Sequence, residues 1–180
     1  MKSLSTKDFI LMAMFAAMLA VASVFVIPIG PVPITLQVFF FLLIPSLLGA
    51  FKGLITISLY LILGLIGLPV FAGGTQGFQA LLSPSFGYLI GSLAVALYLG
   101  STIKPNHSYI RQLAYMTGAI GILYLFGITY QYFIMNVLLE IPLSLKTILI
   151  TNISVFFPID LIKALFACTV YRRLNKIVIN

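Results

Sequence analysis

Long apolar runs, separated by short segments rich in proline, glycine or charge, are the feature that most constrains the fold of this chain. A transmembrane helix needs about 20 consecutive apolar residues, so the chain has room for roughly five to seven spans. Composition agrees, because 62% of the 180 residues are hydrophobic and only 7% are charged, far from the balance of soluble domains. We predict an all-α integral membrane protein, with residues 1–180 forming one transmembrane domain. The apolar periodicity places a bundle of six transmembrane helices at about residues 9–27, 35–50, 53–69, 82–100, 110–132 and 147–171.

The basic residues predict how this bundle is oriented. Six spans put both termini on one side of the membrane, together with Lys2, Lys7, Lys52, Lys104, Arg111, Arg172, Arg173 and Lys176. By the positive-inside rule that side is cytoplasmic. The loops near residues 28–34, 70–81 and 133–146 are then external, with Lys146 in the last of them and Lys163 inside a span. The charges form no basic stripe, so we predict no nucleic-acid partner.

The N-terminal segment resembles the beginning of a signal peptide, because the basic residues Lys2 and Lys7 precede its first apolar run. The run extends about 19 residues, longer than the 7–15 residues of a typical signal-peptide core. We therefore expect it to be retained as the first helix.

Two of the external segments carry neutral polar side chains, which suit a neutral polar ligand. The candidates are Thr35, Gln37, Thr75, Gln76 and Gln79. Gly73 and Gly74 also allow the backbone to approach a ligand closely. The segment over residues 70–86 is longer than most loops, a property of binding loops and lids. A plain connecting loop is the alternative interpretation.

An aromatic residue follows this long segment. Pro84 is expected to start the next helix with Ser83 as its cap, which places Tyr88 one turn into the membrane. Its ring could stack on a flat ligand. The alternative is a residue of the interfacial aromatic belt.

The sharpest candidate site lies in the last span, where Asp160 and Lys163 share one helix face within an apolar stretch. Ionisable groups at membrane depth are costly and usually functional. Pro158 removes a backbone hydrogen bond and should loosen the helix beside them. We predict that a polar ligand binds at this pair, and an intrahelical ion pair with a purely structural role is the alternative.

Small residues form a stripe on the first helix. Ala13, Ala16, Ala17 and Ala20 recur at helical spacing, which permits close approach of another helix. The stripe either packs inside the bundle or docks a partner subunit.

Catalytic motifs give no support for an enzyme. The only histidine, His107, lies in a predicted cytoplasmic loop, and the sequence has no zinc-ligand spacing and no nucleotide-binding glycine loop. We predict a transport subunit with no cofactor and no metal. Any use of ATP must come from another polypeptide.

Four motifs together resemble the BioY family, the biotin-specific substrate-binding (S) subunits of energy-coupling factor (ECF) vitamin importers. They are PVPITLQ at residues 31–37, GLPVFAGG at 67–74, PSFGY at 84–88 and FPIDLIKA at 157–164. The sequence departs from the family pattern at Ile159, where glycine is common, and at Thr75-Gln76, which interrupt the glycine-rich loop.

The resemblance implies a six-helix S-component fold in a prokaryotic plasma membrane, with a biotin site in its outward-facing half. Asp160 suits the ureido N–H groups of biotin, and Lys163 suits the ureido carbonyl. Loop amides, Gln76 or Gln79 are candidates for the biotin carboxylate. The implied partners are a transmembrane coupling subunit and two cytoplasmic ATPases, docked through Ala13, Ala17 and Ala20.

Three other functions stay open at this point. An S subunit for another vitamin would keep the fold but change the pocket. A solitary secondary carrier would use Asp160 as a proton-coupling group and need no partner subunits. A structural subunit would bind no small molecule.

Overall fold

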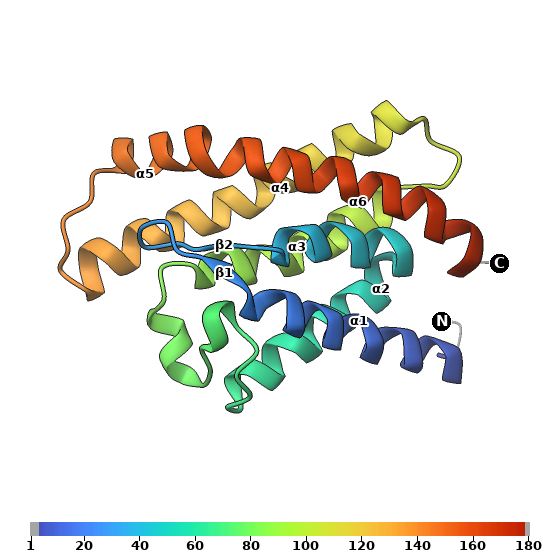
Figure 1. Cartoon of the computed structure of the whole chain (residues 1–180), viewed down its shortest axis with the longest axis horizontal. Coiled ribbons are helices and arrows are strands. Elements are labelled where there is room, and N and C mark those ends of the chain that lie inside the picture. The colour runs from blue at the N-terminus through green and yellow to red at the C-terminus, as the bar shows by residue number, and fades with distance from the viewer. Residues whose placement is uncertain (1–3, 179–180) are drawn as a thin grey trace.

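The computed structural model describes residues 4–178, which form an elongated bundle of helices (Figure 1). The helices are α1 (Thr6–Val24), α2 (Gln37–Leu65), α3 (Phe86–Thr102), α4 (Tyr109–Phe133), α5 (Leu145–Thr151) and α6 (Phe157–Val178). A π-helical turn, Ile134–Leu138, extends α4, and a second one, Asn152–Phe156, joins α5 to α6. Within the described residues, four helical segments are long and apolar enough to cross a membrane, and α3 is a shorter apolar helix. The prediction of an all-α membrane protein is confirmed.

Helix α2 is bent back on itself at Gly49. Its φ of 81° and ψ of 173° are not helical, and L side chains rarely adopt them. The two arms pack closely, because a Cβ at Gly53 would lie 2.8 Å from Cα of Pro45. The break falls within a few residues of the predicted boundary between two spans. The first arm, residues 37–48, rises only about 18 Å at 1.5 Å per residue, so it does not cross the bilayer core by itself.

The last helical rod begins earlier and ends later than the predicted span of residues 147–171. It starts with Ser144, whose side chain accepts a hydrogen bond from the amide of Thr147. The π-helical turn Asn152–Phe156 lies directly before Pro158. A proline removes one helical hydrogen bond and clashes with the preceding turn, and a widened turn accommodates both effects. The predicted local loosening of the helix is therefore present.

The end of the bundle that holds both termini also holds the Gly49 bend and the loop over residues 103–108 (Figure 1). Lys52 bonds to Asp8 here and ties the bend to α1. In the 103–108 loop, burial and the neighbouring charges of Arg111 and Lys104 lower the pKa of His107 below its ordinary value. Lys2 lies outside the described residues. The cytoplasmic assignment of this end stays a prediction.

The opposite end carries a small β-hairpin and two loops. Strands β1 (Val26–Ile27) and β2 (Ile34–Thr35) pair antiparallel. The segment between α2 and α3, residues 66–85, folds into two short 3-10 turns at Ala72–Gly74 and Phe78–Leu82. The loop over residues 139–144 lies at the same end (Figure 1). This end therefore gathers the three segments that the sequence predicts to be external.

Candidate functional site

A buried charged cluster lies at the start of α6. The ammonium of Lys163 donates to Oδ1 of Asp160 at 2.7 Å, and the hydroxyl of Tyr124 donates to Oδ2 at 2.8 Å. Asp160 is only 4% exposed and Lys163 8%. Burying two charges is tolerated only when they are paired and hydrogen-bonded. The pair is therefore held in one geometry by α4 as well as by its own helix.

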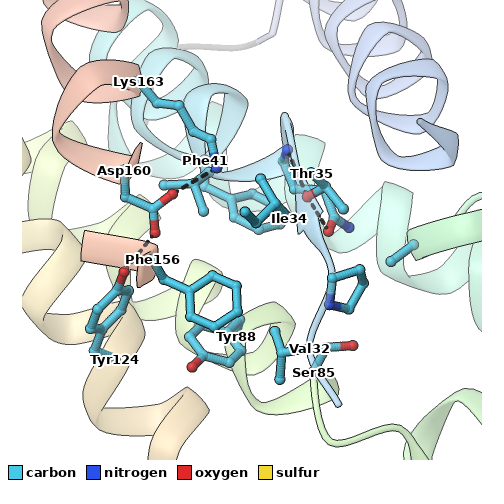
Figure 2. Close-up of a pocket in the computed structure, with 14 residues that line it drawn as sticks. Val32, Ile34, Thr35, Phe41, Ser85, Tyr88, Tyr124, Phe156, Asp160 and Lys163 are labelled. Carbon is cyan, nitrogen blue, oxygen red and sulfur yellow. Dashed lines mark hydrogen bonds and ion pairs between the residues drawn. The ribbon is translucent and has the colours of Figure 1, made fainter. Parts of the chain in front are cut away.

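The cluster faces a cavity (Figure 2). The cavity is narrow, with a free volume of about 40 Å³, well below the roughly 300–1,000 Å³ of most small-molecule sites, so a small-molecule ligand would have to displace part of its lining. Its walls come from the hairpin, two residues of the 66–85 segment, the π-helical turn before α6, and helices α2, α3, α4 and α6. The lining residues are Val32, Pro33, Ile34, Thr35, Gln37, Val38, Phe41, Ala72, Ser85, Tyr88, Tyr124, Phe156, Asp160 and Lys163. The arrangement is an apolar pocket with one charged wall, as expected for a ligand that is largely apolar but has one strongly polar group.

The π-helical turn before α6 contributes to this cavity. Phe156, its last residue, lies beside the charged wall in the cavity lining (Figure 2). Asn152, its first residue, is 1% exposed and accepts a hydrogen bond from the hydroxyl of Tyr88. The ring of Tyr88 lies against Gly127 of α4, where a Cβ would come within 2.3 Å of it. Tyr88 is thus fixed with one face toward the cavity, and the interfacial-belt interpretation does not describe its position.

Two of the predicted polar residues line the cavity but are engaged with the protein. Thr35 donates to the side-chain oxygen of Gln37, and Gln37 donates to the hydroxyl of Tyr60 at 2.8 Å. Tyr60 in turn donates to Ser23 of α1. This chain of hydrogen bonds ties the hairpin to α1 and α2. It positions the cavity wall whether or not Thr35 and Gln37 contact a ligand.

The predicted loop residues lie farther from the charged wall. Gly73 and Gly74 form a turn with φ of 68° and 79°, next to Ala72, which does line the cavity. Gln76 and Gln79 are exposed and do not line it.

The start of the helix after this loop was predicted wrongly, because α3 begins at Phe86 without a side-chain cap. The reason is local: the Ser83 hydroxyl is hydrogen-bonded to that of Ser85 at 2.8 Å.

The alanine stripe of α1 divides between two faces. Ala13 and Ala17 are exposed and Ala20 is partly buried, whereas Ala16 is 3% exposed and belongs to the core. The exposed part is flat, because two small side chains one turn apart lie on it. In the described chain α1 packs chiefly on α2, so one side of α1 is open to a neighbour.

Sequence reasoning missed Tyr124 and Asn152. Both are single polar groups in long apolar helices, so nothing in the local sequence distinguishes them from residues of an interfacial belt. A buried carboxylate needs more than one hydrogen-bond donor. The sequence therefore implied a second donor to Asp160 from another helix, although it did not show that this donor is Tyr124. Its position on α4 becomes evident only when α4 and α6 are packed together.

Known proteins with a similar sequence and a similar structure identify the family to which this architecture belongs. A model of the BioY family matches residues 1–180. A biotin transporter BioY from Thermotoga maritima is 34% identical over 163 residues, 91% of this chain and 92% of that protein. A biotin transporter BioY from Lactococcus lactis subsp. cremoris is 38% identical over 154 residues, 83% of this chain and 80% of that protein. A crystal structure of the S-component for biotin from an ECF-type ABC transporter is 33% identical, with a TM-score of 0.78 over 97% of this chain and 95% of that chain.

The apolar bundle and its charged cavity thus define a membrane protein with the S-component fold of ECF transporters. The chain belongs to the BioY family.

Proposed function

We propose that this chain is the biotin-binding S subunit of an ECF importer and that it captures biotin at the outer face of a prokaryotic plasma membrane. The observation that carries the proposal is the buried Asp160–Lys163 pair facing an apolar cavity in a BioY-family fold. The relatives are named biotin transporters, and the similar solved structure is described as a biotin S-component. Residues 1–180 act as one transmembrane binding domain. No covalent chemistry occurs on this chain.

The charged wall matches the ureido ring of biotin. An ionised carboxylate has about four acceptor positions, and Lys163 and Tyr124 occupy two of those of Asp160. Two acceptor positions are left for the two ureido N–H groups. An ammonium has three donors, and Asp160 takes one of those of Lys163, so the ureido carbonyl can accept another. The ligand would thus complete the hydrogen bonding of both charges.

The rest of the cavity matches the remainder of the ligand. Phe41, Phe156 and Tyr88 supply apolar and aromatic walls for the fused rings. The opposite side of the cavity, at Val32 and Ser85 (Figure 2), would receive the valerate chain. We propose that its carboxylate meets Ser85 and the loop backbone around Gly73 and Gly74. Gln76 and Gln79 are weaker candidates because they do not line the cavity.

The partner of this subunit would be an ATP-driven coupling module, consisting of a transmembrane coupling subunit and two cytoplasmic ATPases. The chain would dock through the flat, exposed part of α1 at Ala13 and Ala17, with Ala20 at its margin. Close helix packing in membranes uses small residues of this kind. Energy from the module would then drive release of biotin to the cytoplasm.

The direct test is isothermal titration of the detergent-purified chain with biotin and two analogues. We expect saturable binding of biotin at micromolar concentration or below. In 2-iminobiotin a guanidine replaces the urea. It is protonated at neutral pH, so it has no acceptor for Lys163 and places a second positive charge beside it, and it should bind more weakly. Biotin methyl ester should lose less, since the carboxylate lies at the mouth. No saturation at micromolar biotin would refute the assignment.

A further inference from the structure

A second cleft lies at the end of the bundle that carries the termini, far from the charged pair. It has a volume of about 410 Å³ and lies between α6, the start of α4 and the 103–108 loop. Its polar lining comes from Gln112, Arg172, Arg173, Asn175 and Lys176. Three of these five residues are cationic, and none of the residues that line it is acidic.

The cations of this cleft have no carboxylate to neutralise them within the described residues. The whole chain has three acidic residues. Asp8 is paired with Lys52, and Asp160 with Lys163. Glu140 lies in the loop over residues 139–144, at the opposite end of the bundle. The cleft is therefore a local excess of positive charge.

One cation is held in place by the bundle. The guanidinium of Arg172 donates to Oε1 of Gln112 at 3.0 Å and to the carbonyl oxygen of His107 at 3.3 Å. Gln112 is fully buried, and its amide nitrogen donates to the carbonyl oxygen of Lys104 at 2.9 Å. This network orients Arg172 before any ligand arrives, whereas the side chains of Arg173 and Lys176 are exposed.

The outer face of α6 changes from apolar to cationic along its length. Ile162 and Phe166 are 53% and 63% exposed, and Thr169, Arg173 and Lys176 continue the same helix face at steps of three or four residues. The step from Phe166 to Arg173 covers about 10 Å of helix at 1.5 Å per residue. A helix face with this order matches the acyl chains and the phosphate of one phospholipid molecule.

We propose that this cleft is a binding site for the phosphodiester of an anionic phospholipid, such as phosphatidylglycerol. Arg172, Arg173 and Lys176 contact the phosphate, and the acyl chains lie along Ile162 and Phe166. Basic pockets between transmembrane helices bind anionic headgroups in this way. Asn175 provides an amide at the same cleft for a headgroup hydroxyl.

A lipid fits this cleft better than an acidic segment of a partner protein. Arg173 and Lys176 lie on the same face as the exposed Ile162 and Phe166, and Ile177 beside them is 72% exposed. An acidic protein surface would neutralise the charges but would provide no apolar contact for the exposed hydrophobic residues of that face. A phospholipid satisfies both parts of the face at once.

The test is native mass spectrometry of the purified full chain, titrated with phosphatidylglycerol or phosphatidylcholine. The parent should retain phosphatidylglycerol preferentially. Each surface cation contributes about fivefold to the affinity for anionic lipid. Arg173→Gln with Lys176→Gln should therefore weaken phosphatidylglycerol binding about 25-fold. Lys146→Gln, which removes one exposed cation at the opposite end, is the matched control and should leave binding unchanged.

Biotin titration and gel filtration show whether the double variant is folded. If it is not, the single variants Arg173→Gln and Lys176→Gln provide the comparison, each at about fivefold. Equal retention by parent and variants, or equal weakening in Lys146→Gln, would overturn the proposal. So would displacement of the lipid by millimolar glycerol phosphate, which would indicate a site for a soluble phosphate ester. If the Arg173 and Lys176 variants bound phosphatidylglycerol as the parent does but no longer assembled with the coupling module, the cleft would be a site for a protein partner instead.

Discussion

Replacing Asp160 with asparagine should weaken biotin binding by about 2–4 kcal/mol, because the change keeps the shape of the side chain and removes its charge. Hydrogen bonds to a charged acceptor are worth roughly 1.5–3 kcal/mol and neutral ones about 1 kcal/mol. Two ureido N–H groups therefore lose a total of about 1–4 kcal/mol. The stranded ammonium of Lys163, 8% exposed, places the expected value in the upper part of that range. The dissociation constant should rise about 30- to 700-fold.

The same substitution separates a binding role from a structural one. A buried ion pair that loses one partner destabilises the fold, and removing both partners together often restores stability. Asp160→Asn should therefore lower the melting temperature, and Asp160→Asn with Lys163→Met should recover much of it. Biotin binding should stay lost in the double variant, because both ligand contacts are gone.

Isothermal titration and thermal melting of the same preparations provide these values. Glu140→Gln is the matched control, since it also converts a carboxylate to an amide but lies on an exposed loop. It should change neither property. A folded Asp160→Asn variant that binds biotin as tightly as the parent would refute the reasoning and make the pair structural.

Four further outcomes are expected. Tyr124→Phe removes one hydrogen bond to Asp160 and should weaken biotin binding about tenfold, measured by titration against the parent. Ala17→Leu should leave biotin binding intact and abolish co-purification with the coupling subunit and ATP-dependent uptake; intact uptake would place docking elsewhere. Gly49→Ala forces a side chain into a positive-φ bend and should lower the melting temperature in detergent, whereas Gly121→Ala, in open space on α4, should not. Because the pKa of His107 is lowered, the folded state resists its protonation, so stability should fall as the pH drops below 6.5, and less so in His107→Gln.

The apolar runs predicted the class of fold because hydrocarbon leaves helices as the main solution for a chain without barrel patterning. Boundaries were harder to predict. The bend at Gly49 was close to the predicted boundary, but the first arm of α2 covers only residues 37–48, because the helix starts after the hairpin and breaks at Gly49. The last helix was longer than predicted, because hydropathy declines from Arg172 onward while helical hydrogen bonding continues to Val178.

The candidate site likewise has residues that could be predicted from the sequence and residues that could not. Asp160 and Lys163 could be predicted, since charge is conspicuous in an apolar sequence and their spacing alone places them on one face. Gln76 and Gln79 looked equivalent to Gln37 in sequence, yet only Gln37 lines the cavity. The difference arises from the 3-10 turns of the 66–85 segment, which leave both loop glutamines exposed. Such turns depend on tertiary contacts, including the Phe71 ring that occupies the space beside Gly64.

The packing around the cavity also implies that a ligand could cross the bundle only if the helices rearrange. Between the Asp160–Lys163 pair and the C-terminal end of α6 the helix is tightly packed, and Ala164, Ala167 and Cys168 are fully buried. On the facing helix, Ile44 and Leu47 are 0% and 3% exposed. Opening this core would expose several apolar side chains at about 1.5–3 kcal/mol each, unless lipid or another helix replaced the lost contacts. If biotin binds at Asp160 as proposed, it can reach the other end of the described bundle only when these helices rearrange. A partner that moves the whole bundle, or that covers the exposed face of α1 while helices part, would supply the missing contacts, and this is the role that the proposal assigns to the coupling module.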